Sequence, residues 1–220
     1  MADENETLLK VHQFYDAPER VKAKARISEA EYEKLYKESI NDPEAFWSKI
    51  AKEELTWFKE WERVFKWDYP YYQWFVNGKI NITYNCLDRH VENGRRNKIA
   101  FIYNNENGDE QKITYGELLA RVNQFANGLK SMGVKKGDRI AIYMPPILEQ
   151  IIAMLACARI GAIHSVVYAG FSAQALRTRI EDADAKMVIC STWTRRRGKK
   201  VDLKAIRSEE RRVGKECIVK

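Results

Sequence analysis

The sequence predicts an α/β fold of parallel βαβ units with flanking helices, preceded by a helical, tryptophan-rich N-terminal extension. Three observations lead to this prediction. Short apolar runs begin near residues 139, 163 and 186, amphipathic segments of helical length separate them, and five of the six tryptophans lie earlier, within residues 47–74. Because crossovers between parallel strands are nearly always right-handed, successive βαβ units form a parallel sheet covered by helices, and its strands are expected to be buried on both faces.

The composition is that of a globular protein with a local excess of positive charge. Hydrophobic residues make up 45% of the 220 residues and charged residues 31%, as expected for one or two domains with a real core. Through Thr194 the chain has 27 basic and 27 acidic residues, whereas the last 26 residues have 11 and 4. The net charge of +7 is therefore local, which argues against nucleic acid as the main partner.

Cysteine spacing and hydropathy favour a soluble, cytoplasmic protein. The four cysteines form no CxxC pair and have no histidine at metal-ligand spacing, so we expect reduced thiols and neither a zinc site nor a redox pair. The acidic residues 1–6 are unlike a secretory signal. The longest apolar run, residues 151–158, is too short to span a bilayer.

The N-terminal extension is predicted to hold two helices after an extended arm that reaches about residue 26. Ser28 and Glu31 form a capping-box pattern that begins the first helix. Asp42 and Pro43 begin the second, because aspartate is a good N-cap and proline suits the first helical position. The apolar face of the second helix is predicted to consist of Phe46, Trp47, Ile50 and Ala51.

The tryptophan-rich residues 47–74 allow two interpretations. Aromatic side chains among lysines could stack on the bases of a nucleic acid. Lysine and glutamate balance here, however, and the aromatic spacing is irregular, which favours a non-periodic segment anchored on a larger domain by burial of its rings. Asn77 and Gly78 then form a turn pair, and we take Gly78 as the end of the extension.

Two histidines invite a catalytic interpretation that the sequence does not favour. His90 follows Asp88 and Arg89, but no motif places a serine or cysteine nucleophile near it, so we expect a structural hydrogen-bonding role on a helix. His164 lies within an apolar strand and is expected to be a core histidine with satisfied hydrogen bonds.

The main domain is predicted to begin with a hairpin and an amphipathic helix. Residues 98–104 and 111–114 are β-prone and flank a polar turn with glycine, as hairpin strands do. Thr114 and Glu117 form a second capping box, and the helix that they begin ends at Gly133.

The rest of the chain is predicted to alternate between strands and helices. Residues 139–144 form a strand, and Pro145 and Pro146 begin a helix that is apolar almost all round and ends at Gly161. We then expect a strand, a helix and a strand over residues 163–167, 173–183 and 186–190. The turn at residues 168–172 therefore lies at the carboxyl end of a parallel strand, where open α/β sheets bind ligands.

Three strings of the sequence carry a family resemblance. They are WDYPYYQWF (residues 67–75), WFVNGKINITYNCLDRHV (residues 74–91) and GVKKGDRIAIYMPPILEQIIAMLACARIGAIHSVVYAGFS (residues 133–172). With them the chain resembles the acetyl-CoA synthetases, AMP-forming acyl-CoA ligases of the adenylate-forming superfamily, from about residue 10 to about residue 206. The resemblance implies that the βαβ units are part of the large N-terminal domain of an adenylate-forming enzyme.

The resemblance implies a two-step ligase. A short carboxylate attacks the α-phosphorus of ATP to give an acyl-adenylate and diphosphate, and the thiol of coenzyme A then displaces AMP. The small molecules implied are acetate, ATP and coenzyme A, with Mg²⁺ in the full-length enzyme. The family's phosphate loop, adenylate motif, ribose-binding aspartate and C-terminal lysine domain do not occur in these 220 residues. The resemblance therefore implies an amino-terminal fragment, inactive alone, with no catalytic residue.

The resemblance also implies two segments that bind coenzyme A as co-substrate. The first is the turn that contains Tyr168 and Gly170, where the family has an aromatic residue followed by two glycines. Glycine at such a turn lets the backbone approach a ligand closely. Here Ala169 replaces the first glycine.

The second segment is the basic run at residues 194–200, just after the last predicted strand. Arg196 and Lys199 match the family's two basic positions, and Gly198 matches the second of the small residues between them; Arg197 departs from the pattern by replacing the first. Guanidinium groups bind phosphate oxygens through paired, charge-assisted hydrogen bonds, which suits the phosphates of coenzyme A. Spacing alone would favour a solvated loop or a nucleic-acid patch.

We therefore expect three parts: an acetyl-CoA-synthetase-type extension over residues 1–78, the first part of the AMP-binding domain over residues 79–206, and an atypical tail over residues 207–220. Alternatives stay open. The acyl substrate could be propionate or another short acid instead of acetate, and the chain could be a non-catalytic module that binds coenzyme A or a nucleotide. A nucleic-acid-binding protein with a basic tail is a more distant alternative.

Overall fold

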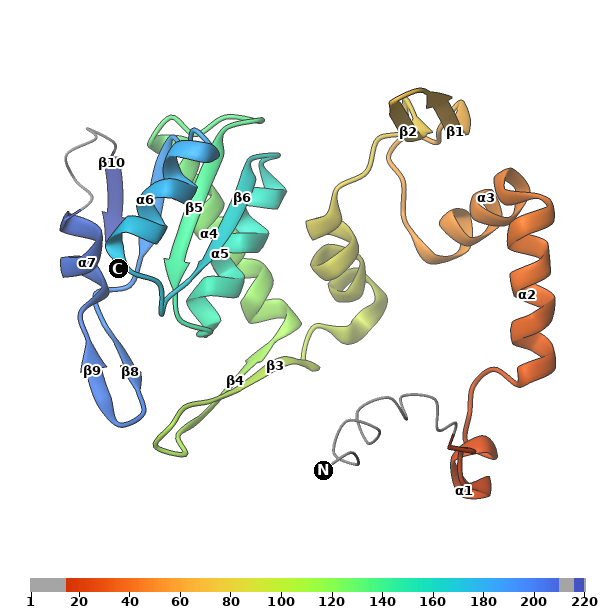
Figure 1. The fold of residues 1–220 in the computed structure, drawn as a ribbon, viewed down its shortest axis with the longest axis horizontal. Helices are drawn as coiled ribbons and strands as arrows, with labels where there is room; N and C mark the ends of the chain where they lie inside the picture. The colour runs from red at the N-terminus through yellow and green to blue at the C-terminus, as the bar shows by residue number, and fades with distance from the viewer. Residues whose placement is uncertain (1–14, 210–215, 220) are drawn as a thin grey trace, which may run out of the picture. The chain divides into compact units, whose positions relative to one another are not determined.

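The computed structural model describes residues 15–209 and 216–219 (Figure 1). The chain divides into two compact units, one of residues 1–54 and 63–76, the other of residues 55–62 and 77–220. The predicted extended arm lies partly outside the described residues, and its described part contains a short helix, α1 (Glu19–Lys22), that the sequence did not predict.

The two helices predicted for the extension are present in the first unit as α2 (Glu29–Asn41) and α3 (Pro43–Glu54). At the start of α2, the Ser28 hydroxyl accepts the N–H of Glu31 at 3.2 Å, and the Glu31 carboxylate accepts the N–H of Ser28 at 2.9 Å. At the start of α3, the Asp42 carboxylate accepts the N–H of Ala45 at 3.0 Å. Each helix therefore begins where its capping side chain satisfies backbone donors that lack a partner within the helix.

The prediction that the tryptophan-rich segment is non-periodic is wrong for its second half, whereas the burial of its rings on the larger domain stays a prediction. This half forms an antiparallel hairpin of β1 (Arg63–Asp68) and β2 (Tyr71–Val76). Phe65 pairs with Trp74 across the strands, with ring centroids 4.7 Å apart, and several rings are exposed, Trp67 by 62%. Cross-strand aromatic pairs stabilise such a ladder through ring contact, and the charged residues between them obscured the alternation.

The second unit contains every strand and helix predicted for the main domain. The π-helical turn η1 (Tyr84–Asp88) and the segment η2 (Val91–Arg95), whose helical backbone is interrupted at Asn93 and Gly94, come first. The elements that follow are β3 (Ile99–Asn104), β4 (Glu110–Thr114), α4 (Tyr115–Ser131), β5 (Arg139–Met144), α5 (Leu148–Arg159), β6 (Ile163–Tyr168), α6 (Ala173–Asp182), β7 (Met187–Cys190), β8 (Thr194–Arg196), β9 (Lys199–Val201), α7 (Leu203–Glu209) and β10 (Glu216–Val219).

The predicted parallel sheet is confirmed, with strand order β10-β7-β5-β6. Helices α4 and α5 pack on one face of it, and α6 and α7 pack on the other (Figure 1). Successive crossovers place β6 on one side of β5 and β7 on the other, so β5 is covered on both faces and paired along both edges. This is the predicted α/β class. The boundary proposed at residue 206 stays a prediction, and α7 runs across it.

The expectation of burial on both faces holds for β5 and β7 but is wrong for β6. Among the described strands β6 lies at the edge of the sheet, and Ile163 and Val166 are 55% and 44% exposed. His164 is half-buried there, and this burial lowers its pKa below the ordinary value. The expectation that its hydrogen bonds are satisfied stays a prediction.

The structural interpretation of Asp88 and His90 agrees with the geometry. The Asp88 carboxylate accepts two hydrogen bonds from the Arg159 guanidinium, at 2.7 and 2.8 Å, which ties η1 to the end of α5. The His90 ring packs 5.2 Å from that of Tyr115, and partial burial together with nearby arginines lowers its pKa. Asn81 also holds this segment against α5, because its side-chain amide donates to the last carbonyls of the helix, those of Ala158 and Arg159. Much of the string NITYNCLD (residues 81–88) thus serves to dock on α5.

We predict that Arg159→Ala lowers the free energy of unfolding by about 1–3 kcal/mol, because it leaves the Asp88 carboxylate, only 16% exposed, without its partner. Urea unfolding followed by circular dichroism measures this. Arg177→Ala is the matched control: it removes an exposed ion pair with Glu181 within one helix, worth about 0.5 kcal/mol or less. Equal losses in the two variants would contradict the assignment.

Candidate functional site

The carboxyl edge of the sheet brings both predicted ligand-binding segments together. In the strand register Met144 of β5 lies opposite Tyr168 of β6, and Tyr143 lies opposite Cys190 of β7. The three strands therefore end level with one another. The turn at residues 168–171 and the basic run after Cys190 leave the sheet at this edge, toward which the β5 arrow points in Figure 1.

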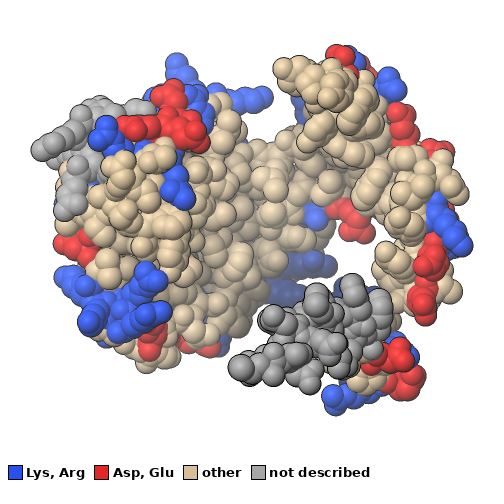
Figure 2. All heavy atoms as spheres, viewed as in Figure 1, with Lys and Arg blue, Asp and Glu red and all other residues tan. Residues whose placement is uncertain are grey.

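The basic run is a hairpin of β8 and β9, which the sequence did not predict. Its two central residues, Arg197 and Gly198, have φ values of 50° and 73°, the left-handed pair that a tight two-residue hairpin turn needs. Arginine in this region costs about 1 kcal/mol relative to glycine. This is the structural consequence of the departure that Arg197 makes from the family pattern. Figure 2 shows the resulting cluster of blue spheres at lower left, where Figure 1 places the hairpin.

Three of the predicted site residues are in contact. The Arg196 guanidinium lies 5.5 Å from the ring centroid of Tyr168, at cation–π distance. A Cβ added to Gly170 would lie 2.5 Å from Arg196 Nη1 and 2.5 Å from Tyr168 Cε1. A larger residue at 170 would displace the ends of these two side chains, so glycine leaves room for them to lie as they do. Ala169 needs no such freedom, because its backbone is not left-handed and its side chain packs in the core.

A second contact between an aromatic ring and an arginine links the glycine turn to α6. The Phe171 ring lies edge-on to that of Tyr168, with centroids 5.6 Å apart, and the Arg179 guanidinium lies 4.3 Å from the Phe171 centroid. Arg179 also donates to the carbonyl of Ala175 at 2.8 Å. Sequence reasoning missed Arg179, because nothing in its spacing on the helix shows that it faces the turn. The edge thus carries arginines from two elements.

Tyr143 of β5 holds the backbone of the glycine turn (residues 168–171) through hydrogen bonds from the core. Its side chain is fully buried, and its hydroxyl lies 3.0 Å from the carbonyl oxygen of Phe171 and 3.2 Å from that of Ala169, so it donates to the turn. Burial raises the pKa of Tyr143 and keeps the hydroxyl protonated as a donor. The sequence predicts a strand over residues 139–144 and assigns no role to Tyr143. One signal was available, because a tyrosine buried in a strand needs a partner for its O–H.

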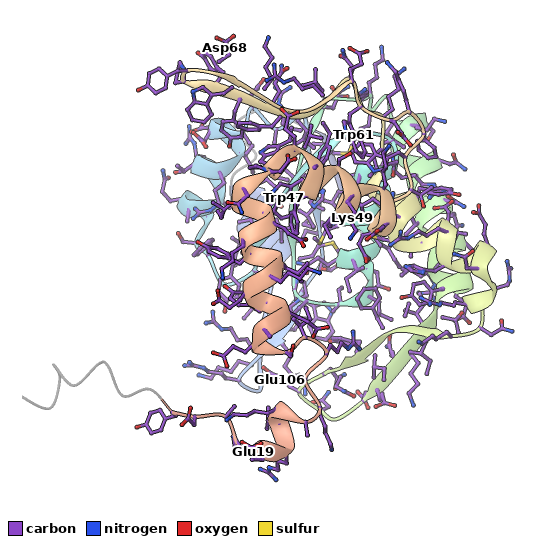
Figure 3. The ribbon with its side chains drawn as sticks, turned by 90° about the vertical axis from the view of Figure 1, so that its right-hand side faces the viewer. Glu19, Trp47, Lys49, Trp61, Asp68 and Glu106 are labelled. Carbon is purple, nitrogen blue, oxygen red and sulfur yellow. The ribbon has the colours of Figure 1, made fainter. Side chains whose placement is uncertain are left out.

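The tip of the basic hairpin touches the β3–β4 hairpin. The two carboxylate oxygens of Glu106 accept the N–H groups of Arg197 and Gly198 at 3.0 and 3.2 Å, and Arg195 donates to the Asn107 side chain at 2.9 Å. The same N–H groups, with the charge of Arg195, lower the pKa of Glu106. Figure 3 labels Glu106 low in the view. Lys199, the remaining predicted residue, is exposed at the start of β9.

This arrangement can bind phosphate groups through its arginine and lysine side chains. Burial raises the pKa of the thiol of Cys157, a residue of α5, to about 12, because its side chain lies in the core. No group of three or more His, Cys, Asp or Glu side chains within the described residues could hold a metal ion, so the Mg²⁺ that the resemblance implies for the full-length enzyme does not fit residues described here.

A parallel sheet covered by helices, with a glycine turn and an arginine-rich hairpin at its carboxyl edge, defines an α/β protein whose basic edge is chemically suited to phosphate groups. The chain belongs to the AMP-binding enzyme family, whose model matches residues 87–220. A second model, described as the acetyl-coenzyme A synthetase N-terminus, matches residues 32–86. The resemblance drawn from the sequence strings is thereby confirmed.

Curated relatives bear the same description. An acetyl-coenzyme A synthetase of Chlorobaculum tepidum is 47% identical over 204 residues, which are 92% of this chain and 31% of the relative. One from Deinococcus radiodurans is 50% identical over 83% of this chain and 28% of its own length. One from Helicobacter pylori strain P12 is 53% identical over 85% and 29%. The chain thus spans about three tenths of the length of these relatives.

A solved structure shows the same fold. The acetoacetyl-CoA synthetase from Streptomyces lividans matches with a TM-score of 0.80 and 24% identity, over 86% of this chain and 30% of that one. At this identity the match concerns the fold alone.

We predict that Tyr143→Phe speeds hydrogen exchange of the amides at residues 169–172, because the turn loses the hydroxyl that holds its carbonyls, at a cost of about 1 kcal/mol in unfolding free energy. Exchange measured by mass spectrometry tests this. Tyr103→Phe, in the β3–β4 hairpin, is the control and should leave the turn unchanged. Unchanged exchange in the Tyr143 variant would contradict the positioning role.

Proposed function

We propose that this chain supplies one wall of the coenzyme A site of an acetate–CoA ligase, which converts acetate, ATP and coenzyme A into acetyl-CoA, AMP and diphosphate. The observation that carries the proposal is the contact between Tyr168, Gly170 and Arg196 at the carboxyl edge of the sheet. The family membership and the names of the relatives supply the reaction. Partners are then small molecules, without nucleic acid or membrane.

The proposed roles follow from the geometry. Arg196, oriented by the Tyr168 ring, and Lys199 bind phosphate oxygens of coenzyme A through charge-assisted hydrogen bonds. Arg197 and Gly198 form the turn that holds these two side chains on adjacent strands. Tyr168 and Gly170 form the surface on which coenzyme A lies, and the hydrogen bonds of Tyr143 hold the backbone of this turn in place.

The reaction steps themselves are assigned to no residue of this chain. In the proposed ligase the carboxylate attacks the α-phosphorus of ATP, and the coenzyme A thiol then displaces AMP from the acyl-adenylate. The described residues contribute binding and orientation of the second substrate. ATP, AMP and Mg²⁺ are proposed to bind to parts of the ligase other than these 220 residues.

The acyl substrate is proposed as acetate because the relatives cited above bear the name acetyl-coenzyme A synthetase. Propionate or another short acid is the alternative within the same reaction. A module that binds coenzyme A or a nucleotide without catalysis is the alternative of another class. No helix within the described residues is long and apolar enough to cross a membrane, and we propose the cytoplasm as the location.

Titration with coenzyme A tests the site. We predict that Arg196→Ala and Lys199→Ala each weaken binding by about tenfold or more, because each removes a hydrogen bond to a charged group. Lys130→Ala is the matched control, since Lys130 is exposed near the end of α4, away from the carboxyl edge, and should change the affinity less than about twofold. Unchanged affinity in both hairpin variants would remove the site assignment.

Diphosphate release separates the ligase proposal from its binding-module alternative. We predict that the 220-residue chain alone releases no diphosphate from acetate and ATP, whereas a chain extended by the remainder of a relative, such as that of Chlorobaculum tepidum, does so. Turnover by the chain alone would contradict our proposal that it supplies binding groups only. A chimera that folds and binds coenzyme A but stays inactive would favour the non-catalytic module.

A further inference from the structure

The turn at Arg197 and Gly198 has the geometry of an anion-binding site. Consecutive left-handed residues direct their two N–H groups to one side of the chain, and such backbone concavities bind anions. Here both N–H groups point at a single carboxylate, that of Glu106, which is 91 residues earlier in the chain than Arg197. The contact is long-range and is not a consequence of the hairpin's own sequence.

The Glu106 carboxylate forms no ion pair with the described arginine and lysine side chains of the basic hairpin. Five of the seven residues at 194–200 are arginine or lysine, and none of these five side chains forms an ion pair within the described residues. Both oxygens of Glu106 are used by the backbone N–H groups. A phosphate monoester has three terminal oxygens and up to two negative charges, so it could take both N–H groups and still accept from a guanidinium.

We propose that Glu106 is an internal occupant of a phosphate-binding turn, and that a phosphate monoester binds to Arg197 and Gly198 by displacing it. Displacement is easy because the Glu106 side chain is exposed and its carboxylate is rehydrated when it leaves. Glu106 therefore lowers the affinity of the basic hairpin for phosphate. That the phosphate belongs to coenzyme A rests on the proposed function, whereas occupation of the turn does not.

The test compares Glu106→Gln with Asp109→Asn. Both variants remove one negative charge from the β3–β4 turn, but the Asp109 carboxylate accepts from Asn105 at 2.8 Å and not from the basic hairpin. Long-range charge would therefore act similarly in both. Coenzyme A, its analogue without the 3′-phosphate, and inorganic phosphate are titrated into each variant, with the amide signals of Arg197 and Gly198 followed by NMR.

We expect Glu106→Gln to strengthen binding of coenzyme A and inorganic phosphate by about three- to tenfold, the factor that corresponds to one net hydrogen bond, while Asp109→Asn changes it less than about twofold. The affinity for the coenzyme A analogue without the 3′-phosphate should increase less in Glu106→Gln. Weaker phosphate binding in Glu106→Gln would show that Glu106 holds the hairpin in place, and equal gains in both variants would show a general charge effect; either overturns the proposal.

The titrations with different ligands also distinguish a failure of this inference from a failure of the proposed function. If coenzyme A fails to bind while inorganic phosphate shifts the two amides more in Glu106→Gln than in the wild type, the inference stands and the proposed function fails. If coenzyme A binds and depends on Arg196, but Glu106→Gln does not strengthen binding, the inference alone fails.

Discussion

The pairing of β5 with a parallel strand on each side is the constraint on which the rest of the second unit depends. Because β6 and β7 both run parallel to β5, the crossovers α5 and α6 must pack on opposite faces, and the strands end level at one edge. The apolar residues that bury β5 on both faces stabilise this arrangement. The glycine turn and the basic hairpin are neighbours because two consecutive strands of the chain lie on either side of β5.

The side chains at this edge are positioned by contacts of different kinds. A buried hydroxyl holds the backbone of the glycine turn, a cation–π contact with Tyr168 orients Arg196, and a carboxylate from another hairpin holds the tip of β8 and β9. Only the first lies in the core. The other two are exposed interactions of modest energy. We therefore expect the glycine turn to be rigid and the β8–β9 hairpin to be able to move when a ligand binds.

Much of this could be predicted from local patterns. Capping boxes at Ser28 and Thr114 located two helices, and short apolar runs located three parallel strands. The family resemblance pointed to Tyr168 and Gly170 in the third string and to Arg196 in the basic run, and the structure brings these three residues into contact. The aromatic hairpin of β1 and β2 was missed because its cross-strand pairs lie among charged residues, and the exposure of β6 was missed because apolar strands look alike whether central or at an edge. Tyr143 and Glu106 act through contacts between distant segments, which spacing along the chain does not reveal. Arg179 contacts the nearby Phe171, but its position on the helix does not show this.

Hydrogen exchange of the chain with and without saturating coenzyme A tests the central claim most directly. The claim is that residues 168–171 and 194–200 form one binding surface, so both segments should become protected together, while the amides of α2 in the first unit exchange at an unchanged rate. Protection of only one segment, or protection confined to other parts of the chain, would contradict it.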